Sequence, residues 1–193
     1  MAVFMSTGRI LNIPNILTLA RIALIPVFLA IAYWPPAIGI AEHHGGMMRH
    51  LILTAIFVLA AVTDWFDGYL ARTLNQTSAF GRFLDPVADK LMVAAALIVL
   101  VQWQPTISMA FAAIVIISRE ITVSALREWM AELGARTSVA VSTVGKYKTA
   151  FQMIAISVFL LNWKPLEMWA YALLYAAVIL TLWSMFIYMK AAW

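Results

Sequence analysis

Residues 48–70 read MRHLILTAIFVLAAVTDWFDGYL, an apolar run that ends in two aspartates. The run is long enough for a helix that crosses a bilayer, which needs about 20 mostly apolar residues. Comparable stretches lie at 12–33, 85–103, 106–127, 146–162 and 166–189. The pattern therefore predicts an all-α, polytopic membrane protein, a bundle of six transmembrane helices. In the third stretch, Pro86 either begins the helix or lies within one that starts near Ser78.

The composition is that of a membrane protein. Hydrophobic residues make up 64% of the 193 residues and charged residues 11%, with a mean hydropathy of +0.91. An ordinary soluble domain has roughly 45–50% apolar and 25% charged residues, so a soluble globule is excluded. The absence of cysteine excludes disulfides, thiolate metal sites and a cysteine nucleophile. Because no polar linker separates the apolar stretches, we expect one domain over residues 1–193. We expect membrane lipid to surround it, and we expect no nucleic-acid partner.

The basic residues lie mostly on one side of the predicted bundle. If a short N-terminal segment, residues 1–11, is cytoplasmic, Arg49 and Lys164 are the only basic residues on the outer side of the membrane. The remaining basic residues lie at inner helix ends and inner loops: Arg9, Arg21, Arg72, Arg82, Lys90, Arg119, Arg127, Arg136, Lys146, Lys148 and Lys190. This positive-inside asymmetry predicts that both termini are cytoplasmic. Residues 42–49 are then expected to form a solvated outer loop.

All four aspartates of the chain lie in one short region. Asp64 and Asp67 are three residues apart, about 60° around a helix. Asp85 and Asp89 are four apart, about 40°, so each pair projects from one face. The polar segment 73–80 between the pairs is short enough to turn the chain back. We therefore expect two antiparallel helices whose four carboxylates converge near the cytoplasmic interface.

Carboxylates at this depth need a neutralising partner. Even one charged side chain at a helix centre costs roughly 2.5–3.5 kcal/mol on insertion scales. Oxygen ligands without nearby histidine or cysteine favour hard divalent ions, and four carboxylates are enough for two ions of Mg²⁺ or Mn²⁺. The alternative is a set of salt bridges with Arg72, Arg82 and Lys90. That alternative does not explain why every aspartate lies at two facing sites.

Small residues accompany the aspartates. Gly68 and Ala71 follow the first pair, and Gly81 precedes Asp85 by four residues. Beside a metal pair, a surface without bulky side chains lets a phosphate or nucleotide approach the backbone closely. Arg72 offers a bidentate fork to phosphate oxygens. Close helix packing through small residues is the alternative.

Together these residues form one spaced motif. It reads Asp64-Trp-Phe-Asp67-Gly68-Tyr-Leu-Ala71-Arg72, then eight residues, then Gly81-Arg-Phe-Leu-Asp85-Pro-Val-Ala-Asp89. The chain resembles the CDP-alcohol phosphatidyltransferases, whose eight signature residues are all present here at the family's spacing. The likeness extends over residues 12–21, 119–130 and 145–148, and these flanks resemble the members whose acceptor is glycerol 3-phosphate.

The resemblance implies a homodimeric enzyme of the bacterial inner membrane, with its active site facing the cytoplasm. It implies transfer of a phosphatidyl group from CDP-diacylglycerol to glycerol 3-phosphate, with release of CMP. The implied roles are metal binding by Asp64, Asp67, Asp85 and Asp89, general-base catalysis by Asp89, and CDP-diacylglycerol binding by Gly68, Ala71, Arg72, Ser78, Gly81, Asn15 and Thr18.

The phosphate of the acceptor needs cations of its own. Arg119 lies about two helical turns inside the cytoplasmic end of the fourth stretch, too deep for an ordinary anchor, so we expect a buried anionic partner. An acceptor phosphate is one such partner, with Arg127 and Lys146 closing the pocket. Glu120 is the alternative partner of Arg119. For Arg127, Lys146 and Lys148 the alternative role is that of positive-inside anchors.

Other functions predict other patterns. An ion or proton transporter would place its carboxylates near the midplane, often beside paired broken helices. Here the aspartates cluster toward one interface, beside glycines and arginines. Within the family, the acceptor alcohol is inositol phosphate, serine, phosphatidylglycerol or glycerol 3-phosphate. The basic residues favour a phosphorylated acceptor, and the flanks favour glycerol 3-phosphate.

Overall fold

The computed structural model describes residues 13–34, 42–73, 79–132 and 143–192, and nearly all of them are helical. Within these ranges the chain forms six α-helices: α1 (Ile13–Tyr33), α2 (Glu42–Thr73), α3 (Ala79–Trp103), α4 (Ile107–Glu132), α5 (Thr143–Leu161) and α6 (Glu167–Ala192). A short 3-10 helix, η1 (Lys164–Leu166), precedes α6. The predicted all-α class is therefore confirmed. The expected cytoplasmic segment 1–11 and Ser78 lie outside the described residues.

Among the described residues, four helices are long and apolar enough to cross a membrane. Their candidate spans are Asn15–Tyr33, Gly46–Asp64, Ile107–Met130 and Lys164–Ile187. The apolar segments Lys90–Trp103 of α3 and Tyr147–Leu161 of α5 are shorter. These four helices support a multi-pass membrane protein, and the six spans with cytoplasmic termini stay a prediction.

Helices α2, α3 and α5 begin before the apolar stretches that predict them, α5 by the least. α2 begins at Glu42, so the prediction of an outer loop at residues 42–49 is wrong. No proline interrupts this segment, and its two glycines cost only about 1 kcal/mol each within a helix. α3 begins at Ala79, so Pro86 lies within the helix and does not start it. Pro26 likewise lies inside α1.

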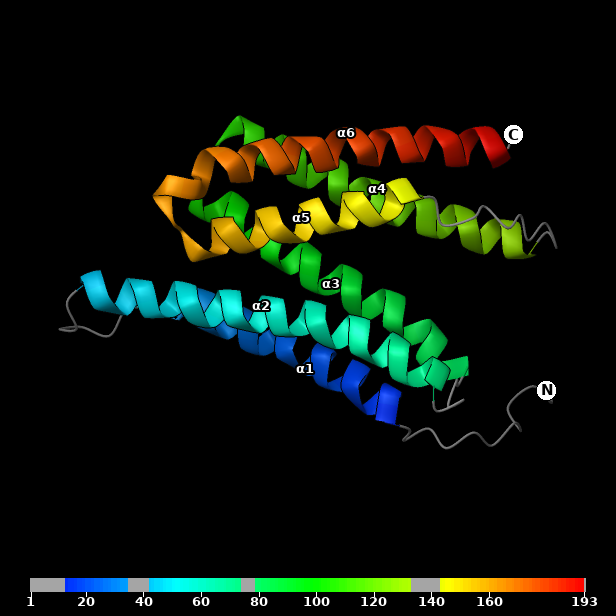
Figure 1. Cartoon of the computed structure of the whole chain (residues 1–193), viewed down its shortest axis with the longest axis horizontal. Coiled ribbons are helices and arrows are strands. Elements are labelled where there is room, and N and C mark those ends of the chain that lie inside the picture. The colour runs from blue at the N-terminus through cyan, green and yellow to red at the C-terminus, as the bar shows by residue number, and fades with distance from the viewer. Residues whose placement is uncertain (1–12, 35–41, 74–78, 133–142, 193) are drawn as a thin grey trace. The chain divides into compact units, whose positions relative to one another are not determined.

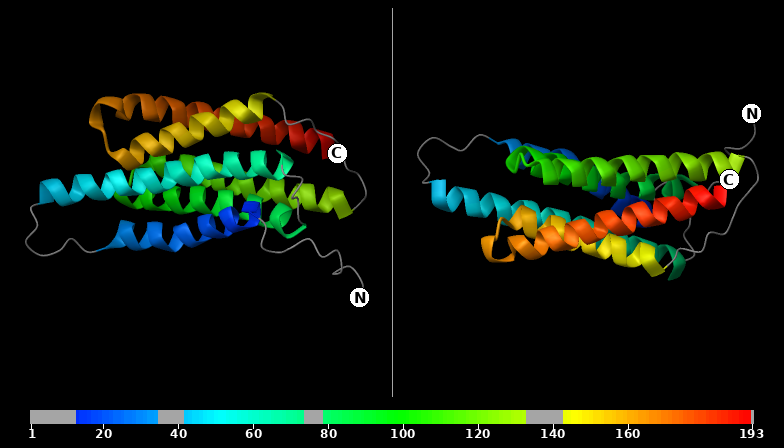
Figure 2. Two further views of the ribbon diagram at one scale, coloured as in Figure 1. Left: turned by 60° about the horizontal axis from the view of Figure 1, so that its bottom comes forward. Right: turned by 90° about the horizontal axis from the view of Figure 1, so that it is seen from above.

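The chain divides into two compact units, residues 1–96 and 97–193, and the boundary falls inside α3. The single domain expected from the sequence stays a prediction. In the first unit, α1 and α2 pack side by side and run in opposite directions (Figures 1 and 2). Their buried faces hold Phe28 and Ala32 of α1 and Phe57 of α2. Much of the remaining apolar surface of α2 is exposed, as expected for a helix that faces lipid.

In the second unit, α5 and α6 form an antiparallel hairpin through η1, and α6 also packs on α4 (Figure 1). The chain leaves α5 through Asn162, whose φ of 53° lies in the left-handed region that asparagine adopts more readily than most residues. Tyr171 of α6 meets Phe159 of α5 edge to face, with ring centroids 4.8 Å apart. Its hydroxyl donates a hydrogen bond of 3.3 Å to Gln104 Oε1, in the turn between α3 and α4. These contacts hold the hairpin against that turn.

Thr106 caps the N-terminus of α4, because its Oγ1 accepts a 3.2 Å hydrogen bond from the Met109 N–H. Thr106→Ala removes the acceptor and is expected to lower the free energy of unfolding by about 1 kcal/mol, whereas Thr106→Ser keeps it. Thermal unfolding of the three proteins in detergent measures the difference. Equal melting temperatures would contradict the capping role.

Candidate functional site

The backbone brings the four aspartates to the facing ends of two consecutive helices. Asp64 and Asp67 lie in the last turns of α2, and Asp85 and Asp89 lie in the first turns of α3. Only residues 74–78 separate these helices along the chain, and both pairs belong to the first unit. α2 ends and α3 begins at the same end of that unit, and the two helices run in opposite directions (Figures 1 and 2). The two helices are therefore antiparallel, as the sequence predicts (Figure 1), while residues 74–78 between them lie outside the described residues.

Asp64 is the one signature aspartate whose side chain the structure describes. Its Oδ1 accepts a hydrogen bond of 2.6 Å from Arg21 Nη1 on α1. The Asp64 side chain is 41% exposed, and Oδ2 takes no hydrogen bond from the described residues. A half-exposed carboxylate whose second oxygen takes no hydrogen bond from the described residues is a suitable ligand for a hard cation. The described side chains include no group of three metal ligands, because those of Asp67, Asp85 and Asp89 are outside that set.

Arg21 contacts a signature aspartate, which the sequence pattern did not indicate. Its side chain is 1% exposed although it carries a charge, and its ion pair with Asp64 joins α1 to the signature end of α2. Asn15 and Thr18, the α1 residues expected to contact the nucleotide, are 1% and 0% exposed. The three polar residues are spaced by three, about 60° apart around the helix, so they share one side of α1. This spacing is the sequence signal that could have indicated a polar face on α1. The positive-inside pattern already explains an arginine at position 21, so the signal is easily overlooked.

The remaining residues of the predicted donor site lie in helices whose backbone is described. Gly68, Ala71 and Arg72 lie in α2, and Gly81 lies in α3. The described side chains do not include these residues, and Ser78 lies outside the described residues altogether. Their roles stay predictions.

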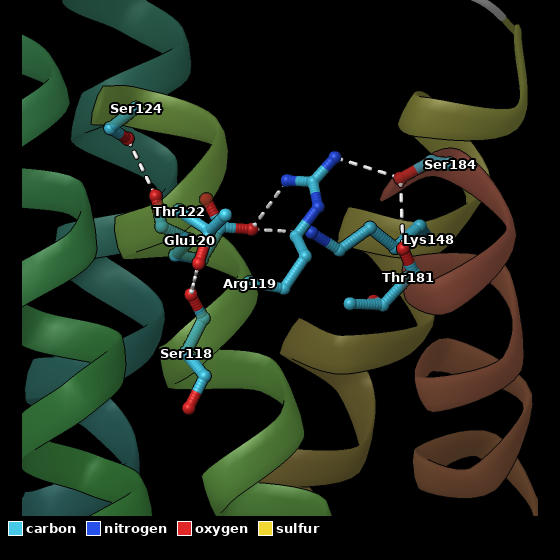
Figure 3. Close-up of polar contacts among 8 residues, drawn as sticks. All are labelled: Ser118, Arg119, Glu120, Thr122, Ser124, Lys148, Thr181 and Ser184. Atoms are coloured by element: carbon cyan, nitrogen blue, oxygen red, sulfur yellow. Dashed lines mark hydrogen bonds and ion pairs between the residues drawn. The ribbon is translucent and has the colours of Figure 1, made fainter. Parts of the chain in front are cut away.

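The second unit contains a cluster of charged and hydroxyl side chains from α4, α5 and α6 (Figure 3). Arg119, 8% exposed, donates from Nη1 to Glu120 Oε1 at 2.9 Å and from Nη2 to Ser184 Oγ at 2.7 Å. Lys148 is also buried, and its Nζ donates to the same Glu120 oxygen. Ser184 in turn donates to the Thr181 carbonyl oxygen at 3.1 Å. One carboxylate thus holds two cations.

Among the predicted acceptor-site residues, the structure describes the side chain of Arg119. The alternative partner that the sequence suggested, Glu120, is in contact with it. Lys148 is not a surface anchor, because its side chain is buried and paired with Glu120. The side chains of Arg127 and Lys146 lie outside the described set.

The cluster is costly to break, because removing one partner of a buried ion pair leaves an uncompensated charge, at about 3–5 kcal/mol. Arg119 and Lys148 are therefore held in place by the carboxylate between them. A guanidinium and an ammonium gathered around one oxyanion form an arrangement suited to anion recognition. Sequence reasoning named Lys148 without its partner and missed Ser184, since a lone serine in an apolar helix gives no signal of its partner.

The spaced aspartate signature on two antiparallel, membrane-type helices defines a class of enzyme, and the comparison with known families agrees. The chain belongs to the CDP-alcohol phosphatidyltransferase family, whose model matches residues 11–183. It is 50% identical over 184 residues to a CDP-diacylglycerol–glycerol-3-phosphate 3-phosphatidyltransferase of Pectobacterium atrosepticum, covering 94% of each chain. It is similar to proteins of the same name from Haemophilus influenzae, at 50% identity over 94% of this chain and 93% of the relative, and from Yersinia pestis, at 48% over 95% and 96%.

Proposed function

We propose that this protein is a membrane enzyme that transfers the phosphatidyl group of CDP-diacylglycerol to sn-glycerol 3-phosphate. The products are phosphatidylglycerol phosphate and CMP. The observation that carries this proposal is the complete eight-residue signature, on the paired ends of α2 and α3. Relatives that are 50% identical over 94% of this chain are named for this activity, which supports glycerol 3-phosphate as the acceptor.

The proposed cofactor is a pair of Mg²⁺ or Mn²⁺ ions, held by Asp64, Asp67, Asp85 and Asp89. When bound, such ions would supply positive charge that offsets the charge of the leaving CMP. The half-exposed carboxylate of Asp64 supports the assignment. The proposed donor site consists of Gly68, Ala71, Arg72, Ser78 and Gly81, with Asn15 and Thr18 on α1.

In the proposed reaction, Asp89 accepts the proton of a glycerol 3-phosphate hydroxyl group. The hydroxyl oxygen forms a bond to the phosphorus that carries the diacylglycerol. The bond from that phosphorus to the CMP oxygen breaks, and CMP leaves with the electron pair. Much of the catalysis in phosphoryl transfer is positioning and charge neutralisation, which suits a site made of carboxylates, small residues and an arginine fork.

The proposed ligands of the acceptor phosphate are Arg119, Arg127 and Lys146. The burial of Arg119 supports its role, because a guanidinium so far inside the helix bundle needs anionic partners, and Glu120 supplies one of them. The burial of this cluster favours charge-assisted hydrogen bonds, which are stronger where water is excluded.

The proposed setting is the bacterial inner membrane, with six spans, both termini in the cytoplasm and the active site facing the cytoplasm. At that interface the acyl tails of the donor stay in lipid while the polar groups meet a soluble acceptor. We further propose that the enzyme is a homodimer, as the family resemblance implies.

A single assay tests the acceptor and the metal. The purified protein, supplied with CDP-diacylglycerol and Mg²⁺ or Mn²⁺, is expected to release CMP fastest with glycerol 3-phosphate, compared with serine, inositol phosphate, phosphatidylglycerol and glycerol. Excess chelator is expected to abolish the release, and added metal to restore it. Faster release with another alcohol would contradict the acceptor, and undiminished release in chelator would contradict the metal.

A further inference from the structure

Ser184 connects α6 to a charged residue far away in the chain. Its Oγ lies 2.7 Å from Arg119 Nη2, although 65 residues separate the two positions. Both side chains are buried, at 4% and 8% exposure (Figure 3). The contact therefore joins the inner faces of α4 and α6 within the second unit.

The direction of each hydrogen bond follows from the groups involved. A guanidinium has only donors, so Ser184 Oγ must be the acceptor. The serine proton is then donated to the Thr181 carbonyl oxygen at 3.1 Å, one turn earlier in α6. This second bond fixes the rotation of the hydroxyl and turns its lone pair toward Arg119.

Serine in an apolar helix ordinarily bonds to its own backbone and no further. Ser157 of α5 does this, donating to the Met153 carbonyl oxygen at 2.8 Å. Ser184 makes the same kind of backbone bond and in addition accepts from Arg119. Ser157 is therefore a matched control for the additional contact.

Two acceptors on two helices hold the Arg119 guanidinium. Glu120, on the same helix, accepts a hydrogen bond from Nη1, and Ser184, on α6, accepts one from Nη2. Because the group is planar, a contact at each terminal nitrogen restrains its plane more than the contact with Glu120 alone. Bidentate recognition of a phosphate depends on that plane.

We propose that Ser184 is a positioning residue that orients Arg119 toward the phosphate of the acceptor. The inference rests on the proposed function, in which Arg119 binds glycerol 3-phosphate. Ser184 touches no substrate in this proposal, and it acts through the guanidinium alone.

Ser184→Ala is expected to raise the KM for glycerol 3-phosphate about tenfold, the loss typical of a hydrogen bond to a charged group, and to leave the KM for CDP-diacylglycerol unchanged. Ser184→Thr keeps a hydroxyl and is expected to restore most of the affinity. Ser157→Ala is expected to change neither constant. If Ser184→Ala does not fold, Ser184→Cys keeps the volume with a weak acceptor and is expected to show the same selective rise.

A double-mutant cycle separates the possible outcomes. In an Arg119→Lys background, which itself raises the KM for glycerol 3-phosphate, Ser184→Ala is expected to have little further effect. If Arg119→Lys raises the KM for glycerol 3-phosphate and Ser184→Ala leaves it unchanged, the positioning role of Ser184 is overturned. The role of Arg119 in binding the acceptor phosphate then still stands. A lowered melting temperature with both KM values unchanged would make Ser184 purely structural and would also overturn the proposal. Wild-type protein that releases no CMP with glycerol 3-phosphate would contradict the proposed function itself.

Discussion

Asp89→Asn is expected to lower the turnover number for phosphatidyl transfer by about 10²–10⁴-fold, the usual contribution of a general base. The amide keeps the shape of the carboxylate but does not accept the proton of the acceptor hydroxyl. Binding of CDP-diacylglycerol is expected to persist, because the other aspartates and the small residues of the signature remain. Steady-state CMP release and a separate donor-binding measurement test the two statements.

Substitutions elsewhere provide the controls. Asp64→Asn and Asp67→Asn are expected to raise the metal concentration needed for half-maximal rate, because both residues are proposed metal ligands. Glu167→Gln makes the same carboxylate-to-amide change in an exposed ion pair of 3.1 Å with Lys164, and it is expected to have no effect on turnover. Near-normal turnover in Asp89→Asn would assign the base to another residue.

Arg119→Ala is expected to lower kcat/KM for glycerol 3-phosphate by between about 30-fold and several thousand-fold. This range corresponds to the roughly 2–5 kcal/mol that truncation of one partner of a buried charge pair costs. Arg119→Lys keeps the charge but loses the planar fork, so a smaller loss, mainly in the KM for glycerol 3-phosphate, is expected. Steady-state kinetics with each substrate varied in turn measures both effects.

The contacts of Arg119 with Glu120 and Ser184 give the competing explanation, in which Arg119 serves only to pack α4. Melting temperatures measured beside the kinetics separate the two. A lowered melting temperature with an unchanged KM for glycerol 3-phosphate would decide for packing. Lys164→Ala removes a cation whose side chain is 74% exposed, and it is expected to change neither quantity.

The helices were predictable because apolar stretches of bilayer length leave few alternatives for the backbone. The residues at which the helices begin were less predictable. Hydropathy marks the apolar part of a helix, whereas the backbone of α2 continues outward through polar residues to Glu42. At Pro86 the sequence left two possible helix starts, and the structure places the proline inside α3. Proline disfavours such a position without forbidding it, so local chemistry alone did not decide.

The signature aspartates were predictable because their spacing is itself the signal. The partners of Arg119 were only half predictable. Glu120 is adjacent in sequence and is the alternative partner that the sequence suggests, but Ser184 approaches from α6, and Lys148 approaches Glu120 from α5. Contacts between distant segments depend on how helices pack, which one sequence does not specify. The role of Arg21 was also hidden, because the positive-inside pattern already explains an arginine at that position.

The pair of Arg21 and Asp64 bears on how the protein is assembled. A carboxylate at the end of an apolar helix is costly until something balances it, and here an arginine of the preceding helix does so at 2.6 Å. Arg21 is thus a resident counter-ion, supplied as soon as α1 and α2 come together. The hairpin of α1 and α2 does not depend on a divalent ion for its cohesion at this position. Under the proposed metal dependence, removal of the ion would therefore stop activity without separating α1 from α2 at this position.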